Sequence, residues 1–170
     1  TASGSSRDWE MSNEVRAAIA GFGAYAPAKV LSNADLEKMI DTTDDWIIQR
    51  TGIRQRRIAG EGESTASMAI AAGKAACQDA GIDPADLDLI IVATMSPEML
   101  CPSTACFVQQ GLGSAKAAAF DLSAACSGFI YALTVARRMI ETGQNRNALV
   151  VGAETLSRFT DYTDRGSCIL

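Results

Sequence analysis

Three short apolar runs, separated by helical patterns, constrain the fold of this chain more than any other feature. Residues 87–94 are rich in β-branched side chains, and two further apolar runs follow at 117–122 and 148–153. Helices are expected at 64–80, at 104–112 and from about residue 129 to residue 140. Strands that alternate with helices form βαβ units. The sequence therefore predicts an α/β fold in which a mixed sheet of buried strands is covered by helices.

A cysteine lies at the junction between the second run and the helix after it. The run ends in small residues, Ser123 to Ala125, and Cys126 follows at or near the first helical position. Unpaired N–H groups and the positive end of the helix dipole favour a thiolate there. One face of the helix is predicted to carry Phe129, Ile130, Leu133, Ala136, Met139 and Ile140. Position alone leaves two interpretations open for Cys126, a nucleophile or a small buried hydrophobic residue.

Composition excludes several classes of function. The chain is 48% apolar with a net charge of −5, which argues for a globular fold and against a general nucleic-acid or anionic-membrane binder. No apolar run is long enough to span a membrane. Five cysteines without a CxxC pair indicate a reducing cytoplasm. The chain has no histidine, so it can supply neither Cys–His catalysis nor histidine-ligated zinc alone, and we expect no metal site.

The first third of the chain is predicted less sharply. Residues 1–14 resemble a flexible leader, and residues 15–170 form the folded part. A first strand is expected at 15–25, with close backbone approaches at its glycines. Asn33 is predicted to cap a short helix, and a second helix is predicted at 44–50, ended by Gly52. The arginines at 54, 56 and 57 are expected on a solvated face, with the alternative that they bind phosphate groups or an acidic partner protein.

Seven segments, in order, resemble one family. Residues 121–133, Asp-Leu-Ser-Ala-Ala-Cys-Ser-Gly-Phe-Ile-Tyr-Ala-Leu, are similar to the active-site segment of β-ketoacyl-acyl carrier protein synthase III, a thiolase-fold condensing enzyme. The other matches are Gly-Phe-Gly-Ala-Tyr-Ala-Pro (21–27), Asn-Ala-Asp-Leu-Glu (33–37), Thr-Asp-Asp-Trp-Ile (43–47), Arg-Thr-Gly-Ile-Arg (50–54), Ile-Val-Ala-Thr (91–94) and Asp-Arg-Gly (164–166). The thiolase fold consists of two similar halves. The resemblance implies that residues 15–170 are the N-terminal half and that the C-terminal half is absent from this chain.

The resemblance also implies the site residues. Cys126 matches the cysteine that is acylated, and Trp46 and Arg165 match residues that stack on the adenine of coenzyme A. Thr42 matches a further contact near the nucleotide, and we assign Arg50, on the same helix face as Trp46, to the same site. From the residues alone, Trp46 is equally well a core residue, and Arg165 a member of a surface ion pair.

The implied activity is the condensation that initiates fatty-acid synthesis. Acyl-CoA acylates Cys126, and the acyl group then condenses with malonyl-acyl carrier protein, with decarboxylation, to give 3-oxoacyl-acyl carrier protein. Coenzyme A enters as part of a substrate, so no cofactor is expected. The family uses a histidine and an asparagine from its second half to stabilise the enolate, and neither matching segment is present here. We therefore expect a second polypeptide or segment to complete the site.

Two other interpretations remain open. The same cysteine is also suited to transfer an acyl group to a hydroxyl or amine acceptor, as related acyltransferases do. In the third interpretation the chain is a non-catalytic subunit that only dimerises. Binding of acyl-CoA by the isolated chain distinguishes this third interpretation from the other two.

Residues 95–103 are expected to determine the length of the acyl primer. In the family this loop reaches across a homodimer, and one residue of it plugs the acyl tunnel of the neighbouring subunit. The spacing to Pro102 and Ser103 places Cys101 at the plug position, where family members that take short primers often have phenylalanine. The alternative is that Cys101 is a loop residue that contacts no substrate. Residues 168–170 resemble the start of one more strand.

Overall fold

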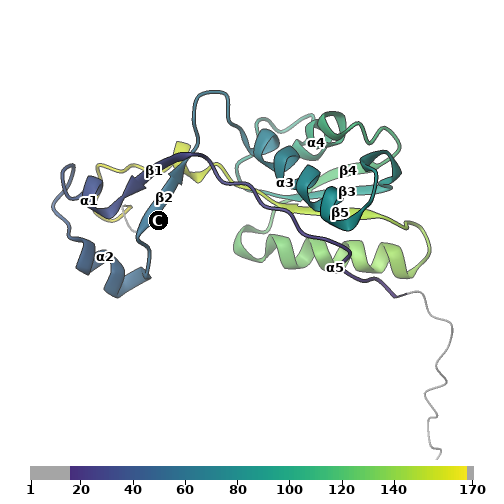
Figure 1. Ribbon diagram of the computed structural model, residues 1–170, viewed down its shortest axis with the longest axis horizontal. Helices are drawn as coiled ribbons and strands as arrows, with labels where there is room; N and C mark the ends of the chain where they lie inside the picture. The colour runs from purple at the N-terminus through teal and green to yellow at the C-terminus, as the bar shows by residue number, and fades with distance from the viewer. Residues whose placement is uncertain (1–15, 168–170) are drawn as a thin grey trace, which may run out of the picture.

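The three apolar runs form one parallel sheet in the computed structural model, which describes residues 16–167 (Figure 1). The central strand β3 (Leu89–Ala93) pairs with β4 (Ala118–Leu122) along one edge and with β5 (Ala148–Gly152) along the other. Leu89 lies beside Ala118 and Ala148, so the three strands start in step. All five residues of β3 are buried, as its continuous apolar character predicts.

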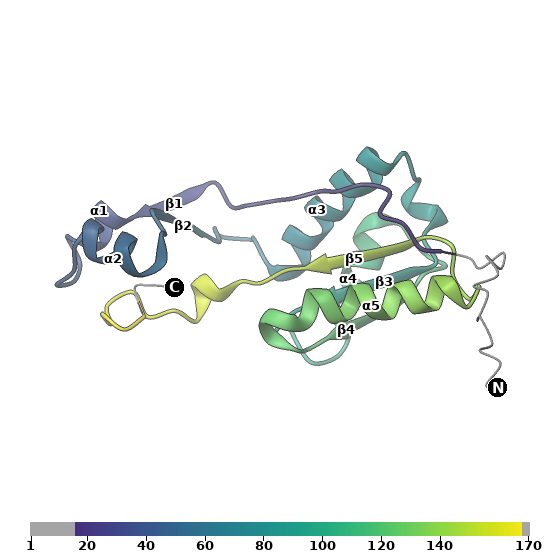
Figure 2. The ribbon, with the colours of Figure 1, turned by 90° about the horizontal axis from the view of Figure 1, so that it is seen from below.

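Helices cover both faces of this sheet (Figure 2). On one face, α3 (Thr65–Ala80) and α4 (Thr104–Leu112) pack in a core with Ile90 and Val92. On the other face, α5 (Gly128–Glu141) packs against Leu89 and Ile91. This alternation follows from the two-residue period of a strand. The α/β fold with a helix-covered sheet is therefore confirmed, but the sheet of the described residues is parallel throughout rather than mixed.

The start of α4 is tied to the strand that leads to Cys126. Ser103, the N-cap residue, makes no side-chain hydrogen bond to the helix. Instead the Asp121 carboxylate of β4 accepts hydrogen bonds from the backbone N–H groups of Thr104 and Ala105, each at 2.7 Å. Asp121 thus takes the role of a capping side chain, and its charge complements the helix dipole. The loop that ends at Ser103 is consequently fixed relative to β4.

A smaller lobe precedes the sheet in the sequence. Its strands β1 (Lys29–Ser32) and β2 (Gln55–Ile58) are antiparallel, and α1 (Asn33–Leu36) and α2 (Asp44–Thr51) lie between them in the chain. Leu36 and Ile47 are fully buried in its core, against which Trp46 and Tyr162 pack. Tyr162 comes from the segment after β5, so the C-terminal part of the described chain returns to this lobe (Figure 1).

The expected first strand is not a strand in the structure. The part of segment 15–25 that is described runs extended beside α3 without a ladder to any other described residue. The close approach at its glycines is confirmed, because a Cβ on Gly23 would lie 2.1 Å from the carbonyl oxygen of Ala72. A strand needs a neighbouring strand as well as an extended backbone, and here the N–H of Phe22 donates instead to the Asp79 carboxylate of α3.

Two predictions in the small lobe are wrong. Ser32, not Asn33, caps α1, and its hydroxyl accepts a hydrogen bond from the N–H of Asp35. Arg56 lies on β2 with only 7% of its surface exposed, rather than on a solvated face. The antiparallel pair β1–β2 was not predicted, because its second strand is polar. The predicted leader (1–14) and the predicted strand at 168–170 fall outside the described residues.

The burial of β4 and α5 also differs from the prediction. β4 is an edge strand, and Phe120 on it is 36% exposed. On α5, the small residues Ala132 and Ala136 face the sheet. Ile130, predicted on the buried face, is 60% exposed. Small side chains allow the helix to approach the sheet closely, and the larger apolar ones then lie to the side of that contact.

Candidate active site

Cys126 lies in a strained turn at the carboxyl end of β4. A single 3-10 turn, Ala125–Ser127, connects β4 to α5, and Cys126 is exposed in it. Ala125 has φ of +46°, the one non-glycine residue with positive φ among residues 16–167. Such a backbone is costly for an alanine and marks a position that the surrounding fold enforces. The predicted strand-to-helix position of Cys126 is confirmed.

Close packing at the start of α5 holds this turn in place. A Cβ on Gly128 would lie 3.2 Å from the Cβ of Ala93 at the end of β3. No side chain caps the N-terminus of α5 by a hydrogen bond. The helix therefore begins directly against the sheet, and its positive end lies beside the cysteine, where developing negative charge is stabilised.

The other described cysteines have different surroundings. Cys77 is buried in α3, and burial, with the nearby charge of Asp83, raises the pKa of its thiol. Such a thiol is less reactive than an exposed one, so Cys77 has a structural role. Cys101 is exposed, and Cys106 is half-buried with its Sγ 3.3 Å from the hydroxyl of Ser103.

The small lobe contains all four residues that were assigned to the nucleotide site. We call them the Trp46 cluster: Thr42, Trp46, Arg50 and Arg165. The guanidinium carbon of Arg50 lies 4.2 Å from the centre of the Trp46 ring, and that of Arg165 lies 5.1 Å from it. Thr42 is buried, and its hydroxyl has no hydrogen-bond partner in the structure. A buried hydroxyl left without a partner is unfavourable unless another molecule supplies one. The structure thus brings together an indole, two guanidinium groups and an unsatisfied hydroxyl.

Sequence reasoning missed several residues that shape this cluster. The Thr43 hydroxyl caps α2 by accepting a hydrogen bond from the N–H of Trp46 at 3.1 Å. Tyr162 packs in the same core as Trp46. Asp41 lies 3.9 Å from the Arg165 guanidinium. Thr43 was detectable as a cap residue from its place before α2, whereas Tyr162 and Asp41 are recognised only once distant segments meet.

The structure places Cys126 and the Trp46 cluster on different lobes (Figure 1). Cys126 lies between β4 and α5 on the sheet body, whereas Trp46 lies on α2 of the small lobe. A ligand that contacts both must therefore be long.

Loop 95–103 is anchored at its base and exposed at its tip. Glu154 accepts hydrogen bonds from the N–H of Met95 and the hydroxyl of Ser96, and Glu98 accepts one from the N–H of Ala66. Partial burial alone would raise the pKa of Glu98, but hydrogen bonds to its carboxylate outweigh burial and lower that pKa. At the tip Leu100 is 96% exposed, and Cys101 beside it is exposed.

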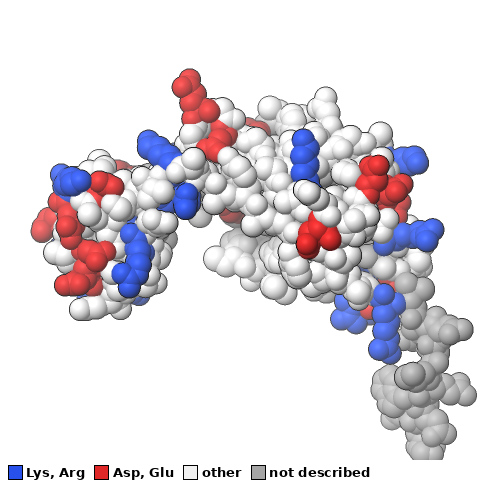
Figure 3. All heavy atoms as spheres, in the orientation of Figure 1, with Lys and Arg blue, Asp and Glu red and all other residues white. Residues whose placement is uncertain are grey.

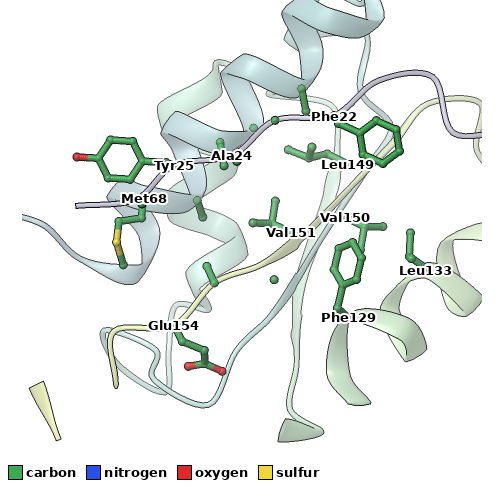
Figure 4. Close-up of a pocket in the computed structure, with 18 of the residues that line it drawn as sticks. Phe22, Ala24, Tyr25, Met68, Phe129, Leu133, Leu149, Val150, Val151 and Glu154 are labelled. Carbon is green, nitrogen blue, oxygen red and sulfur yellow. The ribbon is translucent and has the colours of Figure 1, made fainter. Parts of the chain in front are cut away.

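A long apolar groove separates β5 from the extended segment 17–27 (Figure 4). Its volume is about 1280 Å³, and α3 and α5 form its walls. Phe22 and Tyr25 line it from the extended segment, and Phe129 and Leu133 line it from α5. The edge of β5 that does not pair with β3 has no strand partner among the described residues. Lys, Arg, Asp and Glu crowd the small lobe, whereas much of the surface over the sheet body is uncharged (Figure 3).

The described part of the chain shows neither a membrane span nor a metal-binding cluster. No helix there is both long and apolar enough to cross a membrane. No group of three or more histidine, cysteine or acidic side chains between residues 16 and 167 is arranged to hold a metal ion.

Comparison with solved structures defines the class. The chain superposes on 3-oxoacyl-[acyl-carrier-protein] synthase III from Aquifex aeolicus VF5 with a TM-score of 0.86 and 52% identity, covering 89% of this chain and 49% of that one. It superposes on the priming β-ketosynthase of the R1128 polyketide pathway with a TM-score of 0.89 and 39% identity, covering 92% and 47%. The fold is therefore that of the thiolase-like condensing enzymes.

Sequence comparison points to one kind of condensing enzyme. Residues 120–170 match the family model of 3-oxoacyl-[acyl-carrier-protein (ACP)] synthase III. The β-ketoacyl-[acyl-carrier-protein] synthase III of Caldanaerobacter subterraneus subsp. tengcongensis is 54% identical over 160 residues, which cover 94% of this chain and 48% of that protein. The chain is thus similar to the N-terminal half of β-ketoacyl-acyl carrier protein synthase III, and it spans about half the length of these relatives.

Proposed function

We propose that this chain supplies the acyl-accepting and nucleotide-binding half of a β-ketoacyl-acyl carrier protein synthase III that initiates fatty-acid synthesis. The observation that carries the proposal is the exposed Cys126 on a strained turn at the start of α5. An exposed sulfur beside a helix N-terminus is positioned to attack, and the backbone N–H of Cys126 is one donor for the oxyanion that forms.

The reaction proceeds in two stages. The Cys126 sulfur bonds to the thioester carbonyl carbon of acyl-CoA, the carbon–sulfur bond to coenzyme A breaks, and coenzyme A leaves as its thiol after taking up a proton. Malonyl-acyl carrier protein then loses carbon dioxide. The resulting carbanion attacks the acyl carbonyl, and the bond to Cys126 breaks to release the 3-oxoacyl product. The second stage needs polar groups that stabilise the enolate, which the family supplies from its other half.

The Trp46 cluster is the proposed site for the adenine of coenzyme A. An indole face and planar guanidinium groups stack on an aromatic base, and we assign Thr42 to the wall of this site because its hydroxyl is buried. The pantetheine arm of coenzyme A is long and flexible, which suits a site whose nucleotide cluster and nucleophile lie on separate lobes. Arg50 supports the indole from its position 4.2 Å away.

Removing the stacking residues should weaken coenzyme A binding. We expect Trp46→Ala and Arg165→Ala each to raise the Kd for coenzyme A by roughly tenfold, since such aromatic and cation–π contacts contribute about 1–2 kcal/mol. Isothermal titration calorimetry measures the change. Arg137→Ala, on α5 and bonded to Glu141, is the matched control and should leave the Kd unchanged. An unaltered Kd in both test variants would show that the nucleotide binds elsewhere.

The apolar groove is the proposed seat of the missing half. Among the described residues, one edge of β5 pairs with no strand, and the extended segment 17–27 pairs with none either. The groove between them is lined mostly by apolar residues. The relatives are about twice as long as this chain. We therefore propose that a second polypeptide or segment inserts here and brings the histidine and asparagine, and that the completed protein is a homodimer.

The groove should behave as an exposed apolar surface in the chain alone. We expect strong fluorescence of the dye ANS and self-association of the 170-residue chain, both suppressed when the other half of a close relative is co-expressed. Light scattering with ANS fluorescence measures this. Leu149→Ser, within the groove, should weaken the pairing, and Ser67→Ala, on the exposed start of α3, is the control. A monomeric chain that unfolds cooperatively and binds no ANS would contradict the proposal.

A further inference from the structure

We propose that Asn33 is a positioning residue that sets the orientation of Trp46 by holding both ends of α2. This inference rests on the proposed coenzyme A site. It assigns a role to a side chain that touches neither Cys126 nor the Trp46 ring in any contact of the described structure.

The Asn33 side chain is the centre of a buried polar network. Only 1% of the residue is exposed. Its Nδ2 donates to the Asp44 carboxylate at 2.7 Å and to the carbonyl oxygen of Ile53 at 2.8 Å. Its Oδ1 accepts from the Arg56 guanidinium, and its backbone N–H donates to the carbonyl oxygen of Arg54 at 3.2 Å. Both amide hydrogens and the amide oxygen are therefore used.

The partners fix the orientation of this amide. Arg56 can only donate, so the oxygen must face it. The Asp44 carboxylate and the Ile53 carbonyl only accept, so the nitrogen must face them. An aspartate in this position would have the same shape, but its second carboxylate oxygen would replace the amide nitrogen. That oxygen would face two other acceptors, the Asp44 carboxylate and the Ile53 carbonyl, in a buried site, which is strongly unfavourable.

These contacts bracket α2. Asp44 is the first residue of the helix, and Ile53 follows its C-cap, Gly52. A helix of eight residues is marginal without tertiary support, so its orientation depends on what holds its ends. Trp46 is the third residue and Arg50 the seventh, and both project from this same helix. Asn33 thereby connects α2, which carries Trp46 and Arg50, to Arg56 on β2.

Asn33→Asp is the direct test, made in the complete protein with Trp9→Phe and with any tryptophan outside this chain replaced by phenylalanine, so that Trp46 is the only tryptophan. Coenzyme A binding is measured by calorimetry, Trp46 exposure by acrylamide quenching, and Cys126 reactivity by the rate of iodoacetamide alkylation. We expect the Kd for coenzyme A to rise about tenfold and quenching to increase, with the alkylation rate unchanged. Ser32→Ala is the matched control, because it removes the cap of neighbouring α1 without touching α2, and it should alter none of the three.

A second variant keeps the test decisive even if Asn33→Asp destabilises the whole small lobe. Adding Asp44→Asn replaces an acceptor by an amide that can donate to the new carboxylate, and should restore part of both the affinity and the shielding of Trp46. The proposal is overturned if Asn33→Asp leaves affinity and quenching unchanged, if Ser32→Ala changes them equally, or if the double variant restores neither. If the parent protein binds no coenzyme A, the proposed function fails, and the quenching comparison alone still decides the role of Asn33.

Discussion

Cys126→Ser should reduce acyl transfer by about four orders of magnitude or more, because it removes the group that forms the covalent intermediate. A serine hydroxyl at this turn remains un-ionised at neutral pH and is a far weaker nucleophile than a cysteine sulfur. The side chain is exposed, so the substitution should leave the fold and the affinity for coenzyme A unchanged. Single-turnover transfer from radiolabelled acetyl-CoA, in the complete protein, measures the loss.

Cys106→Ser is the control for this variant. Cys106 is half-buried in α4, and its replacement should leave transfer within about twofold of the parent. Transfer that persists in the Cys126 variant and is lost in the Cys106 variant would move the nucleophile to α4.

Cys101→Phe should slow long acyl primers by about a hundredfold while acetyl transfer persists. Each methylene buried in an open tunnel contributes about 0.8 kcal/mol, so four methylenes contribute about 3 kcal/mol. A phenylalanine at the exposed tip of loop 95–103 would fill that space in the partner subunit if Cys101 is the plug residue. The measurement is kcat/KM for a series of acyl-CoA primers of increasing length on the complete enzyme.

Leu100→Phe provides the comparison, because Leu100 is adjacent and 96% exposed on the same loop tip. A chain-length effect that appears at Cys101 and not at Leu100 identifies the plug. Equal slowing of every primer by Cys101→Phe would show that Cys101 contacts no acyl chain.

Local patterns were sufficient to predict most elements around Cys126. The apolar run at 87–94 contains β3, α4 has the predicted bounds, and Gly52 and Gly81 end their helices with positive φ. These features depend on neighbours within a few residues: side-chain periodicity, cap residues and the conformational freedom of glycine. The Cys126 turn was predictable for the same reason, since strand, small residues and helix are contiguous.

Features that depend on distant partners were not predictable. Asn33 has the residue type of a helix cap. Its actual role, a buried amide that hydrogen-bonds to Asp44, Ile53 and Arg56, is seen only once these distant residues are placed beside it. Arg56 was assigned to the surface because an arginine is buried only where partners satisfy it. The extended segment 16–27 has strand character in sequence but no strand partner among the described residues.

The candidate nucleotide site shows the same division. The spacing of Trp46 and Arg50 places them on one helix face, and the structure confirms that they are in contact. Arg165 is more than a hundred residues away in sequence, and its approach to Trp46 was expected only from the family resemblance. Tyr162, which packs in the same core, gave no signal in the sequence.

The most direct test of this account is to locate the acyl group after exposure to acetyl-CoA. The complete protein is incubated with isotopically labelled acetyl-CoA, quenched in acid, digested and mapped by mass spectrometry. The account predicts one acetyl group per chain, on the peptide that contains Cys126, and none in the Cys126→Ser variant. An acetyl group on Cys77, Cys101, Cys106 or Cys168 with Cys126 unmodified would contradict it.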